Sequence, residues 1–235
     1  MKIHELQAKT MLHKIKPFPL LDPSGRLFAL SQTCHGILLI NWVMQGMRGM
    51  ERKELAFRLL LEVALTLFFG FCLETLGTGG ALAFLLALLL AHSLNFFFNG
   101  HLWVCLRYCH FYRQDPEVIA AWRDRCFERL VDIPIVDEAV CIGSQACGRG
   151  TPGERSDIDL RLFFVAGMED WLAINLLMLR LRTSALFDGI PLDLYACDSP
   201  SSLDRFDRRK PVGIIKDRGG RLVRKLGKRG RWLVR

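Results

Sequence analysis

Two aspartates stand two residues apart in the segment from Ser156 to Val165, where apolar and polar side chains alternate. In a β-strand, side chains two residues apart point to the same face, so the carboxylates of Asp157 and Asp159 are expected side by side. Two negative charges that close repel each other unless a cation lies between them. Hard oxygen ligands of this kind suit Mg²⁺, which proteins bind through one or two carboxylates together with substrate phosphates.

A Gly-Ser pair precedes these aspartates, directly after a short apolar strand predicted over 138–142. Gly143 lets the backbone come close to a phosphate, because it has no side chain in the way. Ser144 offers a hydroxyl and an amide where a helix is expected to begin, which favours an anion. The sequence therefore predicts a phosphate-binding corner beside a pair of metal-binding carboxylates, as a metal-assisted nucleotide site requires.

This combination resembles the DNA polymerase β-like nucleotidyltransferase superfamily, and within it the minimal nucleotidyltransferases and the aminoglycoside adenylyltransferases. Gly143-Ser144 and Asp157-Ile158-Asp159 match the family's Gly-Ser pair and Asp-x-Asp motif residue for residue, and the resemblance covers roughly residues 115–226. The family places a third carboxylate on a later strand. Asp193, in an apolar alternating context, is similar to that residue.

The resemblance implies that a nucleoside monophosphate passes from an NTP, such as ATP, to an acceptor while pyrophosphate leaves. It implies two Mg²⁺ ions held by Asp157 and Asp159, which bridge the triphosphate and stabilise the attacking and leaving oxygens. Asp193 would complete the metal site and help to deprotonate the acceptor. Ser144 and the backbone of Gly143 would hold the β- and γ-phosphates.

One residue departs from the family pattern. The small members carry an arginine where this chain has Cys147. Two alternatives follow: either Arg149 or Arg155 supplies the missing positive charge to the nucleotide site, or the triphosphate binds more weakly than in the family. The alternative explanation for all of these motif residues is a domain that retains the fold but has no catalytic activity.

Two long apolar runs precede this domain, from Leu55 to Leu76 and from Ala81 to Phe98. A helix that crosses a membrane needs about 20 mostly apolar residues, so both runs are long enough. Glycines between them predict a turn, and hence a transmembrane helical hairpin. Five basic residues flank its outer ends, namely Arg48, Arg52, Lys53, Arg107 and Arg113. Positive flanks predict that both ends face the cytoplasm, and two buried helices of a soluble protein are the alternative.

Several polar residues interrupt the apolar segments. His92, Asn95 and Asn99 share one helical face, and Glu62 is expected at a similar depth. Ionisable groups in lipid are costly and find partners, so we expect Glu62 to face His92 and Asn95, within the hairpin or across a homo-oligomer interface. A role in holding the helices together is favoured over a ligand site. The segment from Leu27 to Met44 is interpreted as a helix at the membrane interface, with a third span as the alternative.

The composition, 51% apolar and 24% charged, excludes a disordered chain. We predict an α+β fold, in which an all-α transmembrane hairpin precedes a small mixed β-sheet nucleotidyltransferase domain with flanking helices. The predicted domains are an N-terminal cytoplasmic or interfacial segment 1–53, the hairpin 54–100, a linker helix 101–114, the nucleotidyltransferase domain 115–226 and a basic tail 227–235. Within the domain we expect helices over 116–131, 169–187 and 201–209, strands over 138–142, 156–165 and 190–197, and a β-hairpin over 211–223.

The net charge of +8 is concentrated at the C-terminus, where residues 205–235 carry 13 Lys and Arg against two Asp. Such a segment binds nucleic acid or anionic lipid. A membrane-anchored neighbour favours the lipid surface as its partner over nucleic acid. The expected location is the cytoplasmic membrane, with several spans and with both termini and the catalytic domain in the cytoplasm, where most of the eight cysteines would stay reduced.

Three functions follow from this interpretation. The first is an enzyme that transfers NMP to a small-molecule or lipid-linked acceptor. The second is a regulatory enzyme that attaches AMP to a protein, as minimal nucleotidyltransferase antitoxins do. The third is a non-catalytic membrane module.

Overall fold

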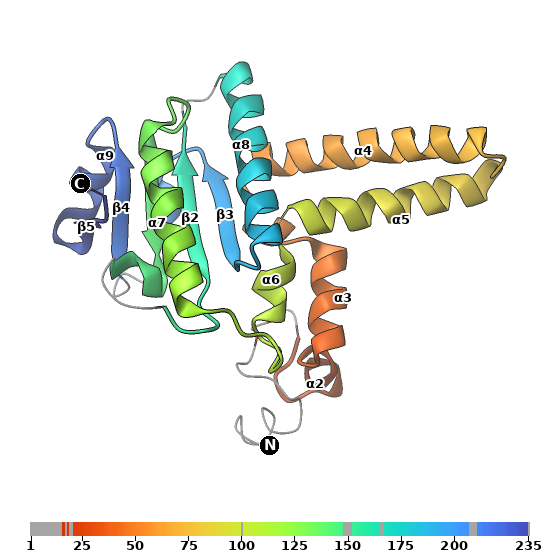
Figure 1. Ribbon diagram of the computed structural model, residues 1–235, viewed down its shortest axis with the longest axis horizontal. Helices are drawn as coiled ribbons and strands as arrows, with labels where there is room; N and C mark the ends of the chain where they lie inside the picture. Colours follow the sequence, from red (N-terminus) through yellow and green to blue (C-terminus); the bar gives the residue numbers. More distant parts are fainter. Residues whose placement is uncertain are drawn as a thin grey trace.

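The structure is a computed structural model that describes residues 16, 18, 21–99, 101–147, 152–164, 167–206 and 211–234. It has an α+β fold in which a five-stranded mixed sheet carries helices on its faces, and two long apolar helices project away from it (Figure 1). The two long helices are α4 (Arg52–Thr75) and α5 (Gly80–Phe98). The coarse architecture agrees with the sequence prediction.

The sheet has the strand order β3-β2-β1-β4-β5. Strand β1 at its centre is antiparallel to both neighbours, whereas β2 pairs with β3, and β4 with β5, in parallel. The strands are β1 (Glu138–Ile142), β2 (Ile158–Phe163), β3 (Leu192–Cys197), β4 (Val212–Asp217) and β5 (Gly230–Trp232).

Helices α7 (Pro116–Asp132) and α8 (Met168–Phe187) pack on one face of the sheet. Helix α7 begins as predicted, since the Asp115 side chain accepts a hydrogen bond from the backbone N–H of Glu117 and Pro116 is the first helical residue. Alternate side chains of β2 and β3, such as Leu160 and Leu194, are buried in the core beneath these helices. The intervening side chains therefore point to the opposite face of the sheet.

That opposite face is covered by the 3₁₀ helix η3 (Pro200–Arg205) and by α9 (Arg221–Leu226). Helix α9 corrects the predicted β-hairpin over 211–223, because only its first half is a strand. Gly220 adopts a left-handed conformation with φ of 65° and starts a helix there. Leu222 and Leu226, one helical turn apart, are buried on the face of α9 that packs against the sheet.

The predicted basic tail, residues 227–235, is part of the fold. Strand β5 pairs with β4 in parallel, and Leu233 and Val234 pack against the main core. Figure 1 shows α9, β5 and the C-terminus at the edge of the sheet opposite the long helices.

Helices α4 and α5 pack against each other along their length, and each is long and apolar enough to cross a membrane. Only 17% of the most apolar 18-residue stretch of α4 is buried within the protein, and only 28% of the corresponding stretch of α5. Their connection uses Gly77 and Gly80, whose φ angles of 86° and 64° require glycine. Helix α4 begins before the predicted Leu55, because Glu54 and Arg58 are buried against the sheet domain rather than exposed.

The segment predicted as one interfacial helix, 27–44, forms two helices, α2 (Arg26–Ser31) and α3 (Cys34–Met44). Thr33 separates them, and its side chain caps α3 by accepting a hydrogen bond from the backbone N–H of Gly36. A disulfide joins Cys34 to Cys109, which follows the short helix α6 (His101–Leu106). The expectation of reduced thiols is wrong for this pair.

Candidate active site

Asp159 on β2 and Asp193 on β3 are direct partners in the parallel register of these two strands. Their side chains share a hydrogen bond on the face of the sheet opposite α7 and α8. Burial, together with the negative charges of Asp157 and Asp193, raises the pKa of Asp159 well above its ordinary value. Asp159 and Asp193 therefore lie side by side on this face of the sheet.

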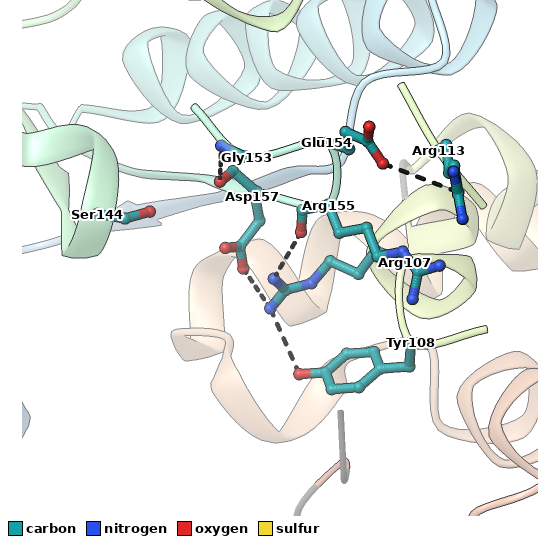
Figure 2. Close-up of a pocket in the computed structure, with 9 residues that line it drawn as sticks. Arg107, Tyr108, Arg113, Ser144, Gly153, Glu154, Arg155 and Asp157 are labelled. Carbon is teal, nitrogen blue, oxygen red and sulfur yellow. Dashed lines mark hydrogen bonds and ion pairs between the residues drawn. The ribbon is translucent and has the colours of Figure 1, made fainter. Parts of the chain in front are cut away.

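Asp157 directly precedes β2, so its side chain points to the same face as that of Asp159. Its carboxylate lies 2.6 Å from the guanidinium of Arg107, which follows α6. Figure 2 shows that Arg107 also reaches the hydroxyl of Tyr108, whose oxygen is 3.3 Å from the same guanidinium nitrogen. The Arg107 side chain is mostly buried, so its charge is held in place beside Asp157.

Asp193 is paired with another arginine. Arg161, two residues after Asp159 on β2, donates to the Asp193 carboxylate at 3.3 Å and to its backbone carbonyl at 3.0 Å. The Arg161 guanidinium also stacks on the ring of Tyr195, 4.5 Å from its centroid. Two arginines therefore share the negative charge of the aspartate cluster.

The Gly-Ser corner lies next to these carboxylates. Gly143 has a φ of 83°, and a Cβ atom placed on it would lie 3.4 Å from the Asp159 carboxylate. Ile142, the residue before it, is the register partner of Asp159 on the adjacent strand. Ser144 is exposed in the 3₁₀ helix η2 (Gly143–Cys147), which takes the place of the α-helix start expected there.

A cavity of about 480 Å³ opens beside this corner. In Figure 2, side chains from the segment after the hairpin and from the sheet domain surround this cavity. Ser144 and Arg107 lie on opposite sides of Asp157. The lining residues are Arg107, Tyr108, Arg113, Ser144, Gly153, Glu154, Arg155, Ser156 and Asp157. Three guanidinium groups thus line a site that also holds a serine hydroxyl and the carboxylates of Asp157 and Glu154, which pair with Arg107 and Arg113. Guanidinium groups suit a polyanion such as a triphosphate, which would compete with these carboxylates.

Arg155 lines the cavity, as the sequence analysis expects of a nucleotide-binding residue, and its guanidinium donates to the backbone carbonyl of His110 at 2.6 Å. Arg149, the other candidate, lies outside the described residues. Arg107, Arg113 and Tyr108 are site residues that the sequence analysis misses. In the sequence, Arg107 and Arg113 stand out only as basic residues after the hairpin, and they are interpreted as evidence for its orientation in the membrane.

The donor set fits a divalent cation by its chemistry. Asp157, Asp159 and Asp193 offer carboxylate oxygens, and a bound cation would oppose the burial and the neighbouring negative charges that raise the pKa of Asp159. Among the described residues, no three acidic, histidine or cysteine side chains already stand in metal-binding geometry. Asp157 and Asp193 face arginines instead, so cation binding requires these two side chains to turn.

A second polar cluster lies within the helical hairpin. Glu62 of α4 accepts hydrogen bonds from His92 Nδ1 at 2.6 Å and from the Asn95 amide at 2.7 Å. The expected contact of Glu62 with His92 and Asn95 is therefore confirmed, and it forms within one chain. The other His92 nitrogen, Nε2, lies 2.8 Å from the backbone carbonyl of Trp42, so α3 joins the cluster.

This cluster continues into the sheet domain. Asn99 is hydrogen-bonded to Asn95 and accepts from Arg182 of α8, and Arg182 lies 2.6 Å from Glu54 of α4. Glu54 also pairs with Arg58 at 3.1 Å and accepts from the backbone N–H of Ala196 on β3. The base of the hairpin is thus tied to the strand that carries Asp193.

Comparison of the chain with protein-family models, with curated proteins and with solved structures finds no match. The resemblance to nucleotidyltransferases therefore rests on the motif residues and on the contacts described above.

Proposed function

We propose that the chain is a membrane-anchored nucleotidyltransferase, which transfers NMP from an NTP to a small-molecule or lipid-linked acceptor and releases pyrophosphate. The observation that supports it most is the contact of the Gly143 corner with Asp159, next to Asp193 and to a cavity lined by three arginines. Gly143, with a φ of 83°, lets the chain turn after β1 next to the Asp159 carboxylate with no side chain in the way of a phosphate.

In this proposal, the triphosphate lies in the cavity of about 480 Å³. Arg107 and Arg155 hold phosphate oxygens from one side, and the Ser144 hydroxyl donates to them from the other. Arg107 leaves Asp157 for the triphosphate, which releases the carboxylate. Tyr108 keeps the Arg107 side chain at the mouth of the cavity through the hydrogen bond between them.

Asp157, Asp159 and Asp193 would hold Mg²⁺, which when bound supplies positive charge to the phosphates and to the attacking oxygen. Asp193 is the carboxylate on the neighbouring strand, so it orients the acceptor hydroxyl and helps to remove its proton. Arg161 holds the Asp193 carboxylate in position through their contact at 3.3 Å. The acceptor approaches from the side of the sheet opposite α7 and α8, next to the cavity that holds the triphosphate.

The hairpin of α4 and α5 anchors the enzyme in this proposal. Its apolar side chains are mostly not covered by the rest of the protein, unlike those of a core helix in a soluble protein. A bilayer would cover them and remove the cost of their exposure to water. The basic residues Arg52 and Lys53 before the hairpin and Arg113 after it favour cytoplasmic ends. A lipid-linked acceptor suits an anchored enzyme.

The experiment is an incubation of membranes that contain the protein with each radiolabelled NTP and Mg²⁺. Label in the organic phase or in a small molecule supports the proposed function, whereas label on a polypeptide band indicates a protein-modifying enzyme. The Asp157→Asn and Asp159→Asn variants should lose about a hundredfold or more of the activity while they remain in the membrane. Absence of label with all four NTPs would indicate a non-catalytic membrane module. The ion pairs Arg107–Asp157 and Arg161–Asp193 favour this alternative, because they occupy two of the three carboxylates.

A further inference from the structure

The outward face of α8 carries large apolar side chains, although the opposite face of this helix already packs on the sheet. Four of them are exposed: Met168, Leu172, Leu176 and Phe187. Leu176 is 50% exposed and Phe187 77%. A row of such side chains on a folded protein marks an interaction surface.

This apolar row is continuous with the hairpin. Leu179 and Thr183, one turn further along α8, line a groove of about 230 Å³ with residues of α4 and α5 such as Leu65 and Phe98. Figure 1 shows the hairpin running crosswise to α8, away from the sheet. If the hairpin enters a bilayer, α8 lies along the surface of that bilayer, as an interfacial helix does.

Basic side chains follow the apolar row around α8. Arg180 is one turn beyond Leu176, and together with Arg125 and Arg129 of α7 it lines a cavity of about 320 Å³ between the two helices. None of these three arginines forms an ion pair with a residue that the structure describes. Asp188 is the acidic residue there, and its carboxylate already accepts from Trp122 at 3.0 Å and from Ser184 at 3.3 Å.

We infer that this cavity between α7 and α8 binds the phosphate of an anionic phospholipid whose acyl chains lie along the apolar row of α8. Three guanidinium groups against one carboxylate leave a positive charge that a phosphate neutralises with bidentate hydrogen bonds. This inference rests on the membrane insertion proposed above, but not on the transfer reaction.

The lipid site is separate from the candidate active site. Helices α7 and α8 cover one face of the sheet, whereas Asp159 and Asp193 point to the other. The two sites can therefore be altered independently, and a lipid at the arginines acts as an anchor rather than as a substrate.

The test uses the full chain in nanodiscs that contain phosphatidylcholine and phosphatidylglycerol in equal amounts. Native mass spectrometry of the released protein counts the two lipids that it retains. We expect the wild type to retain phosphatidylglycerol preferentially. The Arg125→Gln/Arg129→Gln/Arg180→Gln variant should lose this preference by about tenfold or more, since each basic residue near an anionic surface contributes to binding.

The matched control is Arg224→Gln/Lys228→Gln/Arg231→Gln, which removes the same charge from exposed residues at the opposite edge of the sheet. It should keep the preference, because α9 and β5 lie at the edge of the sheet away from the hairpin, although the basic composition of this segment alone predicts lipid binding. A preference lost in the control but kept in the α7–α8 variant would overturn the inference, as would displacement of the lipid by inorganic phosphate. Alkaline carbonate extraction tests insertion: a hairpin that is extracted overturns the premise, whereas failed NTP turnover with intact lipid preference overturns only the proposed enzymatic function.

Discussion

Arg107 lies 2.6 Å from the carboxylate of Asp157, and it belongs to the segment that connects the hairpin to the sheet domain. The same arginine lines the cavity in which we propose that the triphosphate binds. A basic residue from outside the motif-bearing strands therefore takes part in the site. The first prediction follows from this contact.

Replacing Arg107 should weaken NTP binding more than it slows the chemical step. A hydrogen bond to a charged group contributes about 1.5–3 kcal/mol, so Arg107→Gln should raise KM for the NTP by about tenfold or more. Arg107→Lys keeps the charge and should recover part of the loss. Steady-state kinetics on both variants, with the distant Arg218→Gln as control, checks this, and an unchanged KM would remove Arg107 from the site.

Gly143→Ala should lower both stability and turnover. An alanine at φ of 83° is strained, and its Cβ would lie 3.4 Å from the Asp159 carboxylate. We expect a loss of about 1 kcal/mol in the free energy of unfolding, together with reduced NMP transfer. Gly79→Ala is the control, because that position has an ordinary φ and nothing within 4 Å of the added atom. Equal activity in the two variants would contradict the prediction.

Glu54→Ala should be among the most destabilising single changes in the chain. Glu54 is buried between Arg58 and Arg182, and its removal leaves two buried guanidinium groups without their acidic partner. Breaking a buried pair in this way costs about 3–5 kcal/mol. Glu51→Ala removes a partner of the exposed Arg205 and should change the unfolding free energy by less than about 1 kcal/mol. Unfolding in detergent measures both.

Glu62→Leu should loosen the hairpin although it makes the hairpin more apolar. The change takes the carboxylate acceptor away from the half-buried His92 and the buried Asn95. We expect a loss of about 1–3 kcal/mol, seen as a lower thermal midpoint in detergent. Glu74→Leu, at the exposed end of α4, serves as control. A variant that inserts, folds and works like the wild type would show that the cluster is dispensable.

Local sequence patterns predicted the elements around the site well. Asp115 and Pro116 mark the start of α7, and the alternation around Asp157 and Asp159 gives β2, because capping and strand periodicity are properties of neighbouring residues. The pairing of Asp159 with Asp193 is also foreseen, but only through the family resemblance. Nothing in the chain itself reveals which strand will lie beside β2.

Contacts between distant segments could not be predicted in the same way. In the sequence, Arg107 is one of the basic residues that flank the apolar hairpin. Its contact with Asp157 depends on how α6 packs against α3 and β3. The sequence likewise does not reveal that Glu54 and Arg58 form a buried ion pair near the start of α4. The basic composition of residues 227–235 gave no sign of a β-strand. Strand β5 pairs with β4 through its backbone, and its one charged side chain, Arg231, is exposed.

The pairing of Glu54 with Arg182 decides where the chain can be divided for laboratory work. A soluble fragment that begins at Asp115, the boundary suggested by composition, would discard Glu54 and leave Arg182 in an apolar interior with no acid to offset it. It would also discard Arg107 and Tyr108, and with them one wall of the cavity. Expression trials should therefore retain everything from α4 onward, and a shorter version that precipitates would say nothing about whether the intact protein turns over nucleotide.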